Sequence, residues 1–181
     1  TGGRLGAVRY LSVVRIVTGS GSQPIAQTDT SEIAVLKTTA ISKVRMKIRG
    51  PIVGSEDFRT YQVSVSPSSR EFTRYSGYLK QPIADKTYSN SIVAYDEFVH
   101  ALSKANLAKG TAFSGEADDT RGICATGKVH EFEIIQNETI VKRLWTSTCN
   151  GSAGSLAADT NLLHVLFLTQ VPDADRYIGK D

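Results

Sequence analysis

Two cysteines, Cys124 and Cys149, are the only cysteines of the 181-residue chain, and they flank its most strand-like stretch. Between them lie two runs rich in β-branched and aromatic residues, 129–135 and 139–146, joined by the polar turn 136–138. An antiparallel hairpin brings its two ends back together, so the flanking sulfurs come within bonding reach. We therefore predict a disulfide. The alternative is a pair of buried free thiols in a reducing compartment.

A disulfide predicts where the protein works. Such bonds persist in oxidising compartments, so we expect an extracytoplasmic protein that is secreted, periplasmic or anchored at the surface. The chain begins at Thr1 and its one methionine is Met46, so we expect a mature or trimmed fragment from which any targeting segment has been removed. We expect no membrane-spanning helix, because no run of about 18 apolar residues occurs.

The pattern of apolar residues predicts an α+β fold, with a mostly antiparallel sheet and two helices packed on one side. Helical spacing covers 95–107, which Gly110 would close, and a final helix should begin with Asp159 as its N-cap and end before Pro172. We expect a single domain, 1–181, in which the weakest point for a boundary is 81–91. The expected strands are 7–17, 32–37, 42–48, 58–65, 70–78, 129–135 and 139–146.

One expected strand is strongly basic. Lys43, Arg45, Lys47 and Arg49 alternate with apolar residues, so all four cations should share one face. Like charges spaced about 6.5 Å apart repel one another unless anions lie over them. Three interpretations remain open: a solvent-exposed strand face, pairing with acids elsewhere in the chain, or an external anionic partner.

The charge of the chain is unevenly distributed, which bears on these interpretations. Residues 1–80 hold 12 Lys and Arg against 5 acids, whereas residues 81–181 hold 9 against 13. The acids of the second half could therefore pair with the basic strand. An external partner would be an anionic polymer, a membrane surface or another envelope protein. Nucleic acid is not expected, because no aromatic residues interleave with the cations to stack on bases.

Motifs for catalysis, metals and cofactors do not stand out. We expect no metal site, since the acidic segment with Glu116, Asp118 and Asp119 lacks the spacing of a calcium loop. No cofactor is expected, because phosphate-binding glycine loops are absent. The three histidines, His100, His130 and His164, have no metal-ligand spacing and are expected at the surface or partly packed. Two turns carry N-glycosylation sequons, at Asn137 and Asn150.

Together these features favour a non-catalytic binding or structural module of the cell envelope or cell surface. Its expected contact surface is the cationic face of Lys43, Arg45, Lys47 and Arg49, and no catalytic residue is assigned. The alternative is an envelope-directed hydrolase whose site is assembled from residues distant in sequence, with acids such as Glu131 or Glu133. A third interpretation is a subunit whose apolar face a partner completes.

Overall fold

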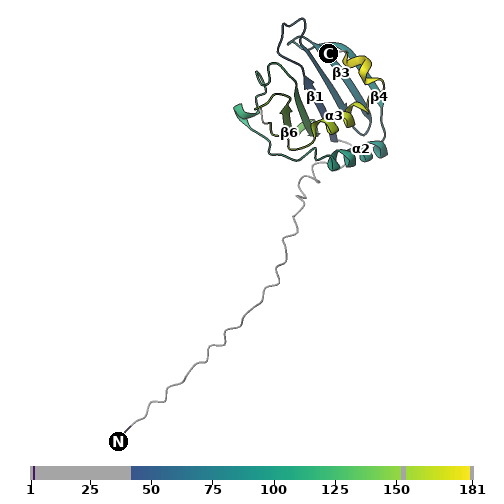
Figure 1. The fold of residues 1–181 in the computed structure, drawn as a ribbon. Coiled ribbons are helices and arrows are strands. Elements are labelled where there is room, and N and C mark those ends of the chain that lie inside the picture. Colours follow the sequence, from purple (N-terminus) through teal and green to yellow (C-terminus); the bar gives the residue numbers. More distant parts are fainter. Residues whose placement is uncertain (1, 3–41, 152–153, 180–181) are drawn as a thin grey trace.

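The computed structural model describes residue 2, residues 42–151 and residues 154–179. A six-stranded antiparallel sheet in the order β4-β3-β2-β1-β5-β6 forms the body of the described part (Figure 1). The strands predicted at 7–17 and 32–37 lie outside the described residues. The observed strands are β1 (Ser42–Arg49), β2 (Arg59–Val65), β3 (Ser69–Ser76), β4 (Gln81–Ser89), β5 (Val129–Gln136) and β6 (Thr139–Ser147).

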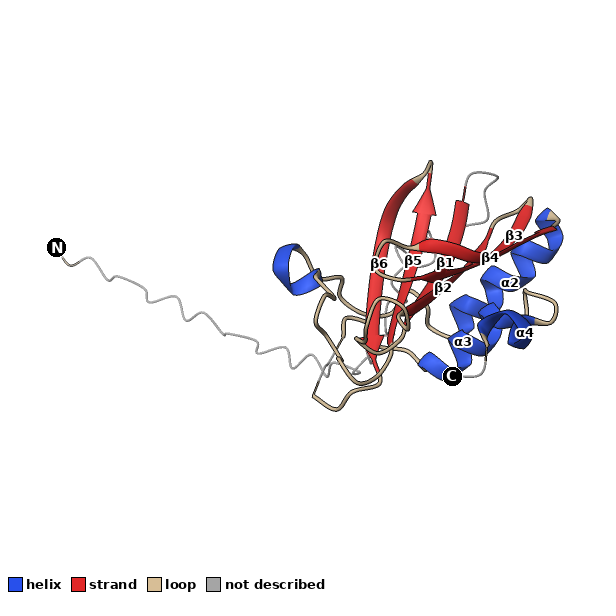
Figure 2. Cartoon of the chain, turned by 90° about the horizontal axis from the view of Figure 1, so that it is seen from above, coloured by secondary structure: helices blue, strands red, loops and turns tan. Residues whose placement is uncertain are grey.

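The helices pack on one face of this sheet, as Figure 2 shows for α2 (Ile92–Lys104), α3 (Thr160–Leu168) and α4 (Ala174–Ile178). A short 3-10 helix, η1 (Gly115–Asp118), lies in the long connection to β5. The predicted α+β fold is therefore confirmed. None of the helices in the described ranges combines the length and the apolarity that crossing a bilayer requires.

Local signals explain where the two longer helices begin and end. Asp159 caps α3 as predicted, because its carboxylate accepts hydrogen bonds from the backbone of Asn161 and Leu162. Ser91 caps α2 in the same way. The prediction that Gly110 closes this helix is wrong: α2 ends at Lys104, and Asn106 takes the left-handed conformation that commonly follows a helix (φ 61°).

The two faces of the sheet differ sharply, and β1 illustrates the difference. Val44, Met46 and Ile48 are at most 2% exposed and lie in the core beneath the helices. The alternate residues of β1 therefore project from the opposite face, where Lys43, Arg45, Lys47 and Arg49 gather as the sequence predicted. The core continues with Val63 and Val65 of β2, Phe72 of β3, Phe132 and Ile134 of β5, Tyr95, Phe98 and Leu102 of α2, and Leu163 and Phe167 of α3.

The predicted hairpin and its disulfide are both present. Strands β5 and β6 are joined by Asn137 and Glu138, which both have positive φ (48° and 60°), as a two-residue type I′ turn requires. At the other end of the hairpin Cys124 and Cys149 are bonded, with an S–S distance of 2.08 Å. Cys124 packs with Val129 and Trp145 in a small second core.

Strand β4 occupies the residues suggested as a domain boundary. Gln81–Ser89 pairs with β3 along its whole length and forms one edge of the sheet. Most of its side chains are exposed, and it contains Pro82, which sheets tolerate at an edge. No alternating apolar pattern marks this strand in the sequence, because neither of its faces is buried.

Candidate functional site

Three of the four cations on β1 pair with acids from the second half of the chain. The antiparallel register sets Arg45 opposite Glu133 and Lys47 opposite Glu131 on β5. The charged atoms of these pairs are 3.0 and 2.6 Å apart. Lys43 Nζ lies 3.6 Å from Glu138, whose side chain is 83% exposed. The like charges of β1 are thus balanced largely within the sheet itself.

Glu131 is the buried centre of a charge network whose other members are partly exposed. Thr120 donates to its Oε1 at 3.1 Å, while Lys47 Nζ and Arg143 Nη2 contact Oε2 at 2.6 and 2.8 Å. Arg143 also pairs with Asp118 at 2.6 Å. Burial by itself would raise the pKa of Glu131, but the charges and hydrogen bonds of Lys47 and Arg143 outweigh it and lower the pKa. Glu131 is therefore ionised, whereas a general acid needs a raised pKa.

Arg49, the fourth cation, has a different environment. Its guanidinium donates to the carbonyls of Thr120 (3.4 Å), Gly50 (3.3 Å) and Ile123. Within the described part of the chain no carboxylate lies at ion-pair distance from it. Burial lowers the pKa of Arg49, and the negative charge of Glu131 offsets this only in part. A half-buried charge balanced mainly by carbonyl dipoles is the least compensated of the four cations.

The Arg49 side chain lines a cleft of about 370 Å³ on the polar face of the sheet. We call it the basic cleft. Its volume lies within the range of small-ligand sites. Strands supply the floor with Lys47, Arg49, Thr60, Glu131 and Arg143, and loops supply the walls with Ile52, Phe58, Tyr78, Lys80, Thr120, Arg121 and Gly122.

The walls of the basic cleft combine aromatic rings with further cations. The rings of Phe58 and Tyr78 stack with centroids 4.0 Å apart, and the Tyr78 hydroxyl donates to the carbonyl of Val53 at 2.8 Å. Lys80 has no carboxylate at ion-pair distance among residues 42–151 and 154–179. Arg121 pairs with Asp119 but its side chain is 91% exposed. The cleft therefore presents an excess of positive charge beside an apolar wall.

The disulfide holds the loop that forms one wall. Cys124 directly follows Ile123, whose carbonyl accepts a hydrogen bond from Arg49, and its bond to Cys149 ties this loop to the end of β6. The Ile52 amide donates to the carbonyl of Ala125 at 2.8 Å, which links the same loop to the β1–β2 connection. The two cysteines thus position the cleft, a role that the sequence did not suggest.

Two of the three histidines come together on the other face of the sheet. The rings of His130 and His164 lie 5.9 Å apart, and His164 Nε2 is 2.8 Å from the Tyr61 hydroxyl. His130 is 8% exposed, so the prediction of a surface or partly packed residue is wrong for it. Burial, with smaller contributions from His164 and Lys128, lowers the pKa of His130 to about 4. Among the described residues no cluster of three or more metal-ligating side chains occurs.

Comparison with known proteins does not add to this geometry. No protein-family model matches the sequence, and no curated protein matches it. What the chain does must therefore be inferred from its own residues.

Proposed function

We propose that this chain is an extracytoplasmic, non-catalytic binding module that holds an anionic group of an envelope polymer in the basic cleft. The observation that carries the proposal is Arg49, whose half-buried guanidinium meets carbonyls but no carboxylate in the described part of the chain. The planar guanidinium is suited to carboxylate and phosphate oxygens, which form short charge-assisted hydrogen bonds with it. An anion at Arg49 would supply the missing counter-charge.

The surroundings of Arg49 favour an anion over a neutral ligand. Lys80 and Arg121 lie at the edge of the same cleft and add positive potential where a polymer would approach. The neighbouring acid Glu131 is already engaged by Thr120, Lys47 and Arg143, so it leaves Arg49 uncompensated. The charges of Lys43 and Arg45, which the sequence also suggested as contacts, support the sheet through their own ion pairs.

Two further features support the extracytoplasmic and non-catalytic parts of the proposal. A disulfide between Cys124 and Cys149 fits an oxidising compartment. The lowered pKa of Glu131 fits a residue that stays charged to hold two cations in place, and a hydrolytic acid would need the opposite shift.

The test compares Arg49→Gln with Lys43→Gln, which removes the same charge from the same strand outside the cleft. Polyphosphate and poly-L-glutamate serve as anionic probes, and dextran serves as the neutral one. Binding can be followed by the fluorescence of Trp145, the one tryptophan, which lies opposite Glu131 in the β5–β6 pairing. We expect salt-sensitive binding of at least one anionic probe, weakened about tenfold or more by Arg49→Gln and hardly by Lys43→Gln.

Two outcomes would contradict the proposal. Dextran could bind as well as the anionic polymers, or Arg49→Gln could bind them as tightly as the wild type does. Binding that appears only with vesicles of phosphatidylglycerol, and with neither polymer, would instead assign the cleft to a membrane surface.

A further inference from the structure

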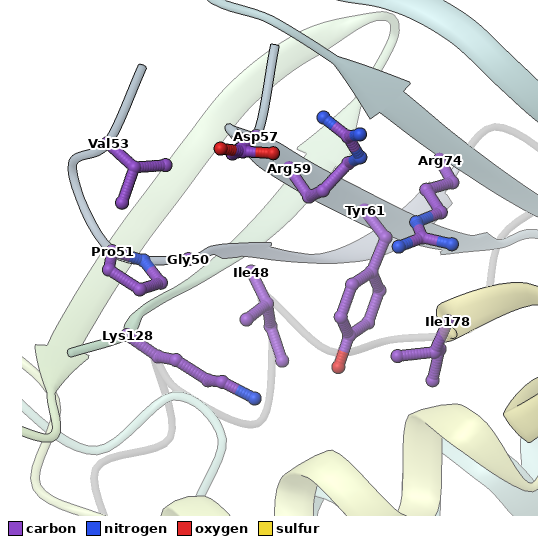
Figure 3. Close-up of a pocket in the computed structure, with 10 residues that line it drawn as sticks. All are labelled: Ile48, Gly50, Pro51, Val53, Asp57, Arg59, Tyr61, Arg74, Lys128 and Ile178. Carbon is purple, nitrogen blue, oxygen red and sulfur yellow. The ribbon is translucent and has the colours of Figure 1, made fainter. Parts of the chain in front are cut away.

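A second cavity lies on the helix-covered face of the sheet, on the side opposite the basic cleft. Figure 3 shows the residues that line it, from the β1–β2 connection to α4, with the Tyr61 ring between Ile48 and Ile178. We call it the Tyr61 cavity. Its volume is about 320 Å³, at the lower end of the range of small-ligand sites. Its lining consists of Ile48, Gly50, Pro51, Val53, Asp57, Arg59, Tyr61, Arg74, Lys128 and Ile178.

The charged groups around this cavity are mainly positive. Three cations, Arg59, Arg74 and Lys128, line it with a single acid, Asp57. In the part of the chain that the structure describes, neither arginine has a carboxylate at ion-pair distance. The charge excess is therefore not cancelled by direct pairing of the arginines.

The two arginines differ in how many of their donors are engaged. Arg59 Nη1 donates to the carbonyls of Glu56 (2.6 Å) and Phe58 (2.9 Å) and lies 3.0 Å from Ser76 Oγ. Among the described residues, Arg74 makes one long hydrogen bond, 3.4 Å, to the carbonyl of Tyr177. Since a guanidinium carries five N–H donors, Arg74 has the larger capacity to bind an incoming anion.

The interior of the cavity is suited to an apolar body. Ile48, Pro51, Val53 and Ile178 contribute aliphatic surface, as their side chains in Figure 3 illustrate. The Tyr61 hydroxyl, 2.8 Å from His164 Nε2, adds a polar atom held in a fixed position. Burial and the charge of Lys128 lower the pKa of His164, so this imidazole is neutral near pH 7 and adds no charge of its own.

We propose that the Tyr61 cavity binds a small amphipathic anion, with its charged head on Arg74 and its apolar body against Ile48 and Ile178. Carboxylate and phosphate heads share the required chemistry, because both offer two oxygens to a guanidinium. This site is separate from the basic cleft: Ile48 and Tyr61 point to one face of the sheet, whereas their neighbours Arg49 and Thr60 line the cleft on the other.

Titration calorimetry with four six-carbon probes tests the proposal on the wild-type protein. Hexanoate and hexyl phosphate carry the anionic head, hexanol is neutral, and hexylamine is cationic. We expect both anions, or the one whose head fits, to bind at least about tenfold more tightly than hexanol, and hexylamine not to bind. The tighter of the two anions identifies the head group. Hexanol or hexylamine binding as tightly as the anions would overturn the proposal, whether or not any variant folds.

Arg74→Gln and Arg70→Gln form a matched pair for assigning the head group to its residue. Both arginines lie on β3, but Arg70 binds the carbonyls of Ser89 and Gln170 and does not line the cavity. Arg74→Gln should weaken binding of the tighter of the two anions about tenfold, and Arg70→Gln should leave it unchanged. Equal binding by wild type and Arg74→Gln would overturn the assignment. Arg49→Gln should also bind that anion as the wild type does, which separates this result from the test of the basic cleft.

Discussion

Replacing both cysteines with alanine removes the covalent link between the loop that ends at Cys124 and the end of β6. The bonded residues are 25 apart in sequence, and the chain-entropy relation gives about 3.5 kcal/mol for closing a loop of that length. A domain of this size loses roughly 3 °C of melting temperature for each kcal/mol, so Tm should fall by about 10 °C. Wild-type protein treated with dithiothreitol should lose the same amount, and the double variant should not respond to the reductant.

Guanidinium unfolding followed by Trp145 fluorescence measures this effect directly, because Trp145 packs with Cys124 in the small second core. The same variant reports on the basic cleft. At temperatures where it remains folded, its polymer binding should weaken, since the loop that offers the carbonyls of Thr120 and Ile123 to Arg49 is no longer tied. An unfolding free energy within about 1 kcal/mol of the wild type would refute the loop-closure reasoning.

Three other substitutions probe the charge network, the histidine and a helix cap. Glu131→Gln leaves Lys47 and Arg143 without their shared carboxylate and should cost about 3 kcal/mol in urea unfolding at pH 7. Because the pKa of Glu131 is lowered on folding, this loss should shrink as the pH falls below about 4.3 and the carboxylate becomes protonated. The pKa of His130 falls from 6.5 to about 4, so the unfolded chain binds more protons between these values. The stabilisation from neutral His130 should be complete above pH 6.5 and be lost as the pH falls toward 4. In His130→Phe, Tm should therefore vary less with pH between 4 and 6.5 than it does in the wild type. Asp159→Ala removes the N-cap of α3 and should cost about 1 kcal/mol, whereas Asp159→Asn should be nearly neutral in the same assay.

The parts of the fold that the sequence predicts are those with strong local patterns. Strand β1 alternates cations with core residues, and the β5–β6 hairpin carries β-branched runs on either side of a polar turn. Strand β4 is not predicted, because its side chains are largely exposed and it contains Pro82. Helix α4 is only five residues long, too short for a periodic signal.

The candidate site was harder to predict, because it depends on register between distant segments. Arg45 and Glu133 are 88 residues apart, and nothing local to either residue indicates the pairing. One signal was nevertheless present: Glu131 and Glu133 have the same two-residue spacing as Lys47 and Arg45, as antiparallel neighbours on one face require. The contact between Tyr61 and His164 spans 103 residues and had no such signal.

The connection between β1 and β2, residues 50–58, contributes to the lining of both cavities. Ile52 and Phe58 belong to the basic cleft, whereas Pro51, Val53 and Asp57 belong to the Tyr61 cavity. A ligand in either cavity would therefore contact a connection that also lines the other cavity. If a ligand in the basic cleft changes the affinity of the Tyr61 cavity, a ligand in the Tyr61 cavity must change the affinity of the basic cleft by the same factor. Titrating each probe in the presence of the other would therefore give two independent measurements of this coupling.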